Sequence, residues 1–349
     1  MPSEDLSSML VKIAICSDLH ADTTLANDLL PRLVAEYVAT LGVDAMIICG
    51  DLSAQKSRFA TALQELRHAG CPIGFVPGNH DVWQMPEDAR PWEDSWSKLD
   101  WIIESCHTAG IQFLGDWVLG GDVFITGTIG WYDYSFAKPD LVNIVGINAY
   151  EEKYIPGFTW LDADFVKWGV PDRDVCASYN KEFNDRLAHH ANFLPTAHRA
   201  TVVVTHVVPF LEGVTYKGDL NWDFSCAFMG NKDLGDIILQ HALPLNVTHI
   251  LFGHTHTPQK FCIGGIRCHC QPFGFFPKLD PNESNLRDIV QRTVQVIDRC
   301  VIFFSYVMLA SCDKKSPPPI QSKRSGRHSC RIKRAQEEHK LSFFLLFWC

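Results

Sequence analysis

Residues 73–81 read Ile-Gly-Phe-Val-Pro-Gly-Asn-His-Asp, an apolar run that ends in a glycine and three polar residues. Similar apolar, partly β-branched runs lie at 11–16, 45–49, 201–204 and 249–252, and each is followed within two residues by an aspartate or a histidine. Short continuous apolar runs are typical of strands that are buried on both faces. We therefore expect five strands that each end in a possible metal ligand, at the edge where open α/β sheets bind ligands.

Segments with helical spacing separate the first three of these strands. Apolar residues recur at this spacing over 25–41 and again over 59–66, where Gly70 closes the segment. Alternation of strand and helix predicts an α/β fold with a largely parallel sheet. Pro31 lies inside the first helical segment, so this helix either kinks there or begins at Pro31.

The polar residues at the strand ends are of the types that hold a pair of metal ions. The set consists of Asp18, His20, Asp51, Asn79, His80, His206, His254 and His256. Hard divalent cations held close together need oxygen and imidazole ligands and one bridging carboxylate, which offsets their mutual repulsion. Asp51 is the natural bridge. Glycines at positions 50, 78 and 253 permit tight turns directly beside these ligands.

The five segments resemble those of the calcineurin-like metallophosphoesterase superfamily. Its blocks read D-x-H, G-D, G-N-H-[DE], a single H after a strand, and G-H-x-H, and all five occur here in family order between residues 18 and 256. The resemblance implies a β-sheet sandwich flanked by helices. It implies that one metal ion is held by Asp18, His20, Asp51 and His256. It implies that the other is held by Asp51, Asn79, His206 and His254.

The resemblance also implies a role for His80, which protonates the leaving group in the family. The expected reaction is hydrolysis of a phosphate ester by a hydroxide that two metal ions activate, with His80 as the general acid. Manganese, iron or zinc would suit these ligands. No sequence feature identifies what orients His80, because its neighbour Asp81 is expected to face the other way.

One difference from the wider superfamily argues against the Ser/Thr protein phosphatase branch. Ser/Thr protein phosphatases carry G-D-x-V-D-R-G, whereas residues 50–56 read Gly-Asp-Leu-Ser-Ala-Gln-Lys here. This leaves phosphomonoesterases, phosphodiesterases and nucleases. A scaffold protein that kept the fold without the chemistry is a further alternative, but such proteins lose ligand positions and none is missing here.

Length and charge limit how the chain can be divided into domains. We expect residues 1–305 of the 349 to form one metallophosphoesterase domain and 306–349 to form a basic tail without a fold. Residues 313–349 carry a net charge of about +6, which leaves about −15 on the remainder of a chain with a total of −9. A nuclease needs a basic groove, so the acidic body favours a small phosphorylated substrate over nucleic acid. The tail could contact nucleic acid or an anionic membrane, or simply be solvated.

An insertion over residues 131–199 is rich in aromatic residues and is expected to cap the site. Trp131 and Tyr132 are candidate substrate-binding residues, because their rings could stack on a base or line an apolar slot. The alternative is that these rings pack the cap onto the sheet. The loop over 215–231 contains a third candidate, Asn221, and is also expected to border the site.

Cysteine usage points to a reducing compartment. Thirteen cysteines at irregular spacing, with no basic and then apolar leader, indicate a cytoplasmic protein without disulfides. Cys262, Cys268 and Cys270 could bind zinc, but their spacing lacks a Cys-x-x-Cys pair, and period-2 alternation puts Cys268 and Cys270 on one strand face, which favours small buried thiols. The apolar runs at 301–310 and 341–349 are too short to cross a bilayer, so no transmembrane segment is expected.

Overall fold

The computed structural model describes most of the first three hundred residues, which fall within the unit Met1–Ile302. The described residues are 11–86, 88, 94–113, 115–120, 123–193, 200–275 and 282–298. The expectations for the tail, 306–349, and for the end of the domain at residue 305 fall outside the described residues.

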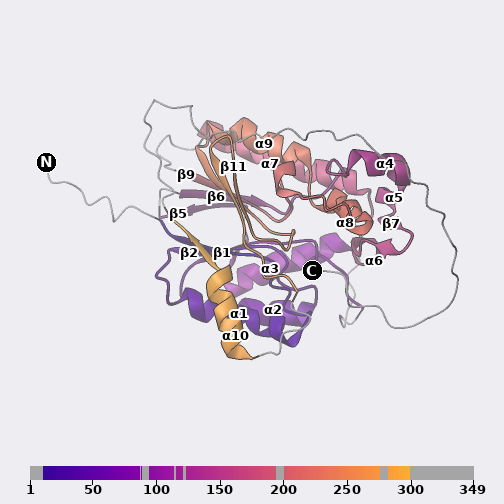
Figure 1. Ribbon diagram of the computed structural model, residues 1–349. Helices are drawn as coiled ribbons and strands as arrows, with labels where there is room; N and C mark the ends of the chain where they lie inside the picture. The colour runs from indigo at the N-terminus through magenta and orange to yellow at the C-terminus, as the bar shows by residue number, and fades with distance from the viewer. Residues whose placement is uncertain are drawn as a thin grey trace, which may run out of the picture. The chain divides into compact units, whose positions relative to one another are not determined.

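Two sheets form the centre of this unit (Figure 1). The first has the order β13-β1-β2-β3-β4, in which β1 to β4 are parallel and β13 is antiparallel to β1. Its strands are β13 (Gln295–Ile297), β1 (Ile13–Cys16), β2 (Ala45–Cys49), β3 (Ile73–Val76) and β4 (Gln112–Phe113). β1, β2 and β3 are buried along their whole length, as expected for strands between two layers.

The second sheet has the order β11-β12-β10-β9-β6-β5, with parallel pairing from β12 to β6 and antiparallel pairing at both edges. Its strands are β11 (Gln259–Ile263), β12 (Ile266–Cys270), β10 (Val247–Phe252), β9 (Ala200–Thr205), β6 (Val123–Thr128) and β5 (Asp116–Leu119). The five predicted strands are all present and divide between the two sheets. The metal-ligand candidates therefore come from both layers.

Helices cover the outer face of each sheet (Figure 1). On the first sheet lie α1 (Leu25–Val38), α2 (Lys56–Leu66), α3 (Ser95–Ala109) and α10 (Glu283–Thr293). On the second sheet α7 (Asp172–Phe193) packs on α9 (Lys232–Ala242) and β6. This arrangement confirms the predicted α/β sandwich flanked by helices.

The remaining elements are short and connect the strands to the site. They are η2 (Arg67–Ala69), α4 (Pro139–Val145), α5 (Ile147–Glu151), β7 (Tyr154–Ile155), β8 (Phe158–Thr159), α6 (Asp162–Phe165), η3 (Leu211–Gly213), α8 (Leu220–Ser225) and η4 (Cys226–Phe228). The predicted insertion over 131–199 thus contains two kinds of structure. The small elements from α4 to α6 form one part, whereas α7 belongs to the helical layer.

The first helix begins earlier than Pro31. The Asn27 N–H donates a hydrogen bond to Oγ1 of Thr24 (3.1 Å), which caps the helix so that it starts at Leu25. The alternative start at Pro31 is wrong, because α1 runs through the proline to Val38.

The cysteines follow the simpler of the two sequence readings. Cys268 and Cys270 are buried on β12 and Cys262 is exposed, and the described residues contain no metal-ligand group at these cysteines. The nine cysteines in the described part of the chain are all free thiols. None of the described helices is both long and apolar enough to cross a membrane.

Candidate metal centre

The ligand candidates lie close together at the strand ends of both sheets. Several of them have a strained backbone conformation. Positive φ angles occur at Asp18 (56°), His20 (46°), Asp51 (56°), His254 (72°) and His256 (50°). Such angles are uncommon for residues other than glycine and cluster at functional sites. The loops after β1 and β2 are fixed to each other, since Asp18 N–H donates to Gly50 O and His20 N–H to Asp51 O, both at 2.9 Å.

The first ligand group contains Asp18, His20, Asp51 and His256, one ligand atom of each lying within 4.8 Å of the others. Nε2 of His20 lies 2.9 Å from Nε2 of His256 and 3.6 Å from Oδ2 of Asp51. Nε2 of His256 lies 3.5 Å from Oδ1 of Asp18. Two imidazole nitrogens and two carboxylates thus face a common point.

The second group contains Asp51, His206 and His254. Nε2 of His206 lies 3.0 Å from Nδ1 of His254 and 3.1 Å from Oδ1 of Asn79, so the amide oxygen joins the group. Backbone carbonyls engage the other ring nitrogens: Cys49 O lies 2.9 Å from Nδ1 of His206, and Phe228 O lies 3.1 Å from Nε2 of His254. Such outer hydrogen bonds fix the ring orientation of metal-binding histidines.

Asp51 belongs to both groups, and its two oxygens have different surroundings. Oδ1 accepts a hydrogen bond from the N–H of His80 (2.9 Å). Oδ2 is buried without a well-formed hydrogen bond and lies 3.6 Å from Nε2 of His20 and 3.4 Å from Nε2 of His206. A buried carboxylate oxygen is rarely left without a partner, and a bridging position between two cations would satisfy it. The residues present therefore fit two metal ions.

The two imidazoles of the second group differ in protonation. Burial, reinforced by His206, lowers the pKa of His254 to about 3, so this ring is neutral and ready to bind a cation. Burial also disfavours a charged His206, but Asp51 and Asp18 outweigh it and raise the pKa of His206 to about 9. We therefore expect His206 to be protonated near neutral pH in the metal-free protein, and a cation that binds here must displace this proton.

Two glycines leave room for the ligands. A Cβ on Gly50, whose φ is +85°, would stand 2.3 Å from Nδ1 of His206, and a Cβ on Gly78 would stand 2.1 Å from Oδ1 of Asp51. Neither position can carry a side chain while the ligands keep their places. Glycine is therefore needed at both positions because the ligand side chains approach the backbone closely, and not only because the chain turns there.

His80 lies beside both groups without belonging to either. Its ring stacks on Trp83, with centroids 3.7 Å apart and 25° between the planes. It also makes a T-shaped contact with the His20 ring, with centroids 4.6 Å apart. Burial lowers the pKa of His80, and the charge of Asp51 opposes this. Asp81 faces away and accepts hydrogen bonds from the backbone N–H groups of 51, 52, 53 and 78 at 2.7 to 2.9 Å. Stacking on Trp83 helps to fix the plane of the His80 ring, and sequence reasoning missed this contact.

A second missed residue comes from the insertion. Asp162 is buried and accepts four hydrogen bonds. Its donors are Asn79 Nδ2 (2.9 Å), Trp83 Nε1 (2.6 Å), Tyr132 Oη (2.9 Å) and Trp160 Nε1 (2.8 Å). Since a carboxylate only accepts, Nδ2 of Asn79 faces Asp162 and Oδ1 faces the metal ligands. No sequence pattern marks this aspartate.

The candidate substrate-binding rings do not reach solvent. Trp131 and Tyr132 are both 0% exposed, and they stack on each other with centroids 4.9 Å apart. Trp131 donates to Asp172 (2.8 Å) and Tyr132 to Asp162, so these rings pack the insertion rather than bind a substrate. Asn221 lies in α8, half-buried, beside the pocket residue Trp222, and its role stays a prediction.

A two-sheet sandwich with two ligand groups that share a carboxylate defines the class of metal-dependent phosphoester hydrolases. The chain belongs to the calcineurin-like phosphoesterase family, whose model matches residues 11–258. This family depends on a dinuclear metal centre, which agrees with the two ligand groups.

Two of the solved structures that the chain matches are the following. The phosphopantetheinyl hydrolase of Mycobacterium tuberculosis is 21% identical, with a TM-score of 0.59 over 76% of this chain and 89% of that one. A dimetal phosphatase of Danio rerio is 12% identical, with a TM-score of 0.46 over 74% of this chain and 86% of that one. At these identities the first likeness shows the fold alone. No curated protein matches the sequence.

Proposed function

We propose that the protein hydrolyses a phosphate ester of a small molecule, with two divalent cations in the candidate metal centre and His80 as the general acid. The observation that carries this proposal is the position of Asp51 Oδ2, a buried oxygen without a well-formed hydrogen bond that lies between the two ligand groups. A scaffold protein has no need to bury a carboxylate oxygen whose nearest partners are two histidines at 3.4 and 3.6 Å.

The proposed ligand sets are those expected from the sequence. Asp18, His20, Asp51 and His256 hold one cation, and Asp51, Asn79, His206 and His254 hold the other. When bound, such a pair neutralises charge on phosphoryl oxygens and supplies an ionised water near neutral pH. Manganese, iron and zinc all suit these ligands.

The chain's own residues supply orientation and a proton. Asp162 turns the oxygen of Asn79 toward the centre, and Trp83 holds the His80 ring beside His20. In this position His80 can give its proton to the departing oxygen, which matters most when that oxygen leaves as a strong base.

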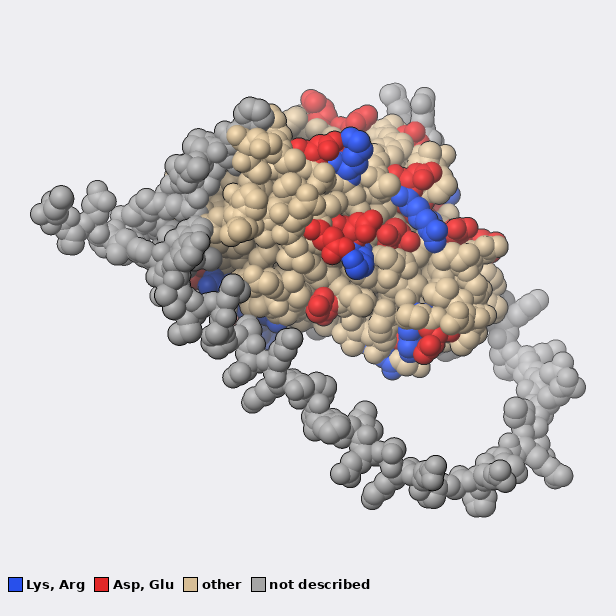
Figure 2. Space-filling view, turned by 90° about the horizontal axis from the view of Figure 1, so that it is seen from above, with Lys and Arg blue, Asp and Glu red and all other residues tan. Residues whose placement is uncertain are grey.

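Charge supports a small substrate rather than a nucleic acid. The body of the chain carries about −15, and the face shown in Figure 2 presents more acidic than basic side chains, with no continuous basic groove over it. A nuclease would gain most of its affinity from phosphate contacts with such a groove.

Two further expectations stay proposals. We propose that residues 1–305 form the catalytic domain and that 306–349 form a separate basic tail. We also propose a cytoplasmic location, which the nine free thiols of the described part support.

The test uses metal-stripped protein that is resupplied with manganese, iron(II) or zinc. Hydrolysis of para-nitrophenyl phosphate and of bis-para-nitrophenyl phosphate is measured for the wild type, for Asp51→Asn and for Asp140→Asn, an exposed aspartate of α4. We expect metal-dependent release that is lost only in Asp51→Asn, and the preferred ester separates monoesterase from diesterase. Two bound metal ions without turnover on any phosphoester of a broad panel would overturn the proposal.

A further inference from the structure

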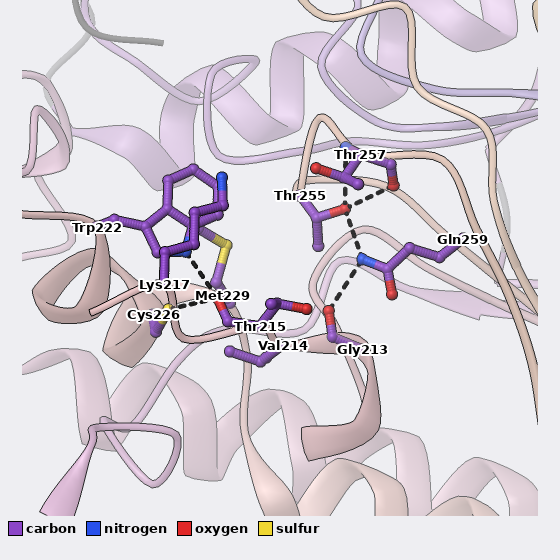
Figure 3. A pocket seen from close by; sticks show the side chains of 10 residues that line it. All are labelled: Gly213, Val214, Thr215, Lys217, Trp222, Cys226, Met229, Thr255, Thr257 and Gln259. Carbon is purple, nitrogen blue, oxygen red and sulfur yellow. Dashed lines mark hydrogen bonds between the residues drawn. The ribbon is translucent and has the colours of Figure 1, made fainter. Parts of the chain in front are cut away.

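A pocket of about 240 Å³ opens between the loop that follows β9 and the loop that follows β10 (Figure 3). It is lined by Gly213, Val214, Thr215, Lys217, Trp222, Cys226, Met229, Thr255, Thr257 and Gln259. Trp222 and Lys217 stand on one side, and Thr255, Thr257 and Gln259 stand on the other. The predicted loop over 215–231 therefore meets the segment that carries the last two metal ligands.

The pocket adjoins the candidate metal centre through His254. Thr255 stands between His254 and His256 in the chain, and its side chain lines the pocket. On the opposite wall Met229 follows Phe228, whose carbonyl oxygen lies 3.1 Å from Nε2 of His254. The His254 ring has Nδ1 toward the ligand group and Nε2 toward the Phe228 wall of the pocket, so a molecule whose phosphate lies at the metal centre must extend past this ring to place its remaining part here.

The pocket walls are braced before any ligand binds. Nε2 of Gln259 donates to the oxygen of Gly213 (2.9 Å) and to Oγ1 of Thr255 (3.1 Å), which ties the two loops together (Figure 3). Nε1 of Trp222 donates to the oxygen of Thr215 (2.7 Å), which closes the loop on itself. A preformed site loses less entropy when it binds a ligand.

The lining carries one positive charge and no negative one. Nζ of Lys217 lies 3.2 Å from the centre of the Trp222 ring, a cation–π contact that holds the ammonium on the pocket wall. The neighbouring Lys138 is paired with Asp223 at 2.7 Å, whereas Lys217 gives Asp223 only its backbone N–H. A pocket with one cation and no carboxylate stands out in a body of charge about −15.

We propose that this pocket binds the leaving group of the substrate, and that this leaving group carries a second anionic group, which pairs with the ammonium of Lys217. The inference rests on the proposed phosphoester hydrolysis and names its substrate class. Val214, Cys226 and Met229 contact the apolar part of the leaving group. The volume lies below the range of pockets for drug-sized ligands, so it fits one ring or a short chain.

The test compares substrates that differ only in this second charge. The two are 4-carboxyphenyl phosphate and its neutral isostere 4-carbamoylphenyl phosphate, each also as the methyl diester in case the enzyme is a diesterase. A third substrate, 1,4-phenylene bisphosphate, replaces the carboxylate by a phosphate and so compares the two kinds of anion. The measured quantity is the ratio of kcat/KM for the carboxylate to kcat/KM for the carboxamide.

Lys217→Met removes the charge, Lys217→Arg keeps it, and Lys138→Met is the matched control, since Lys138 is a nearby lysine outside the lining. We expect the wild type to prefer the carboxylate and Lys217→Met to lower the ratio about tenfold, as for a charged hydrogen bond. Lys217→Arg and Lys138→Met should keep the ratio. No preference in the wild type, an unchanged ratio in Lys217→Met, or an equal fall in Lys138→Met would overturn the inference.

A binding measurement separates this inference from the proposed activity. Calorimetric titration of metal-loaded protein with 4-carboxybenzylphosphonate and 4-carbamoylbenzylphosphonate needs no turnover. Tighter binding of the carboxylate that is lost in Lys217→Met supports the pocket even if no ester is hydrolysed. Equal binding of both phosphonates overturns the pocket while leaving the hydrolysis proposal intact.

Discussion

The side-chain amide of Asn79 donates a hydrogen bond to Oδ1 of Asp162 at 2.9 Å, across 83 residues of sequence. Asp162 belongs to the insertion, and Asn79 belongs to the loop that follows β3. The insertion therefore helps to orient a candidate metal ligand, in addition to any role in covering the site.

This contact makes a prediction for metal affinity. Asp162→Ala frees the Asn79 amide to rotate, so its oxygen no longer faces His206. We expect metal affinity to fall about 10- to 100-fold, as is usual when an outer partner of a ligand is lost. Chelator competition followed by metal analysis of the dialysed protein measures this fall.

Asp172 supplies the matched control. It is also a buried aspartate of the insertion, and it accepts hydrogen bonds from Trp131 (2.8 Å), Tyr134 (2.6 Å) and Lys153 (2.5 Å). Asp172→Ala leaves comparable donors unpaired, so it should cost comparable stability without weakening metal binding. Equal metal loss in both variants would assign Asp162 to folding alone.

The second prediction concerns His80. His80→Ala should keep the metal content, because His80 belongs to neither ligand group. Turnover should fall by about a hundredfold to ten-thousandfold for esters with alkoxide leaving groups. The loss should shrink as the leaving group becomes more acidic, because para-nitrophenolate departs without protonation.

His107 serves as the control for this measurement, because it is an exposed histidine at the end of α3. His107→Ala should match the wild type for every ester. A His80→Ala defect of constant size across leaving groups would contradict the assignment of the acid, whatever its size.

Much of this site could be predicted from the sequence because its chemistry is local. Each ligand candidate follows its strand within one to four residues, so the strand positions and the residue types indicated the candidates, and the family resemblance divided them into two ligand sets. The glycines at 50 and 78 were expected for their turns. Their closer role is to leave room for His206, which comes from the other sheet, and for Asp51, which follows the neighbouring strand β2, and sequence spacing does not reveal these contacts.

The parts that could not be predicted depend on contacts over long sequence distances. Nothing in the sequence around Asp162 distinguishes it from Asp164, which is exposed. Trp131 and Tyr132 were expected at the substrate because aromatic residues serve both cores and binding sites, and only their burial separates the two roles.

A third prediction tests whether Gly50 is needed because the His206 side chain lies against it. Gly50 and Gly70 both have left-handed backbone, with φ of +85° and +70°, but only Gly50 has neighbours where a Cβ would stand. Either change to alanine should cost about 1 to 2 kcal/mol of unfolding free energy through the backbone. Gly50→Ala must also displace His206, so it alone should lose metal ions and activity. Metal analysis and thermal unfolding of both variants test this.

The last prediction concerns the proton on His206 in the metal-free protein. Asp51 and Asp18 raise its pKa to about 9 against the effect of burial, from an ordinary value of 6.5. A raised folded pKa means that the protonated ring stabilises the fold fully below pH 6.5 and that this stability is lost as the pH rises to about 9. Metal-free protein should therefore lose thermal stability between these values.

In an NMR titration the His206 ring, assigned with His206→Gln, should titrate near pH 9. In Asp51→Asn burial dominates, so the same ring should titrate at a lower pH; a wild-type ring that is neutral at pH 7.5 would contradict the prediction.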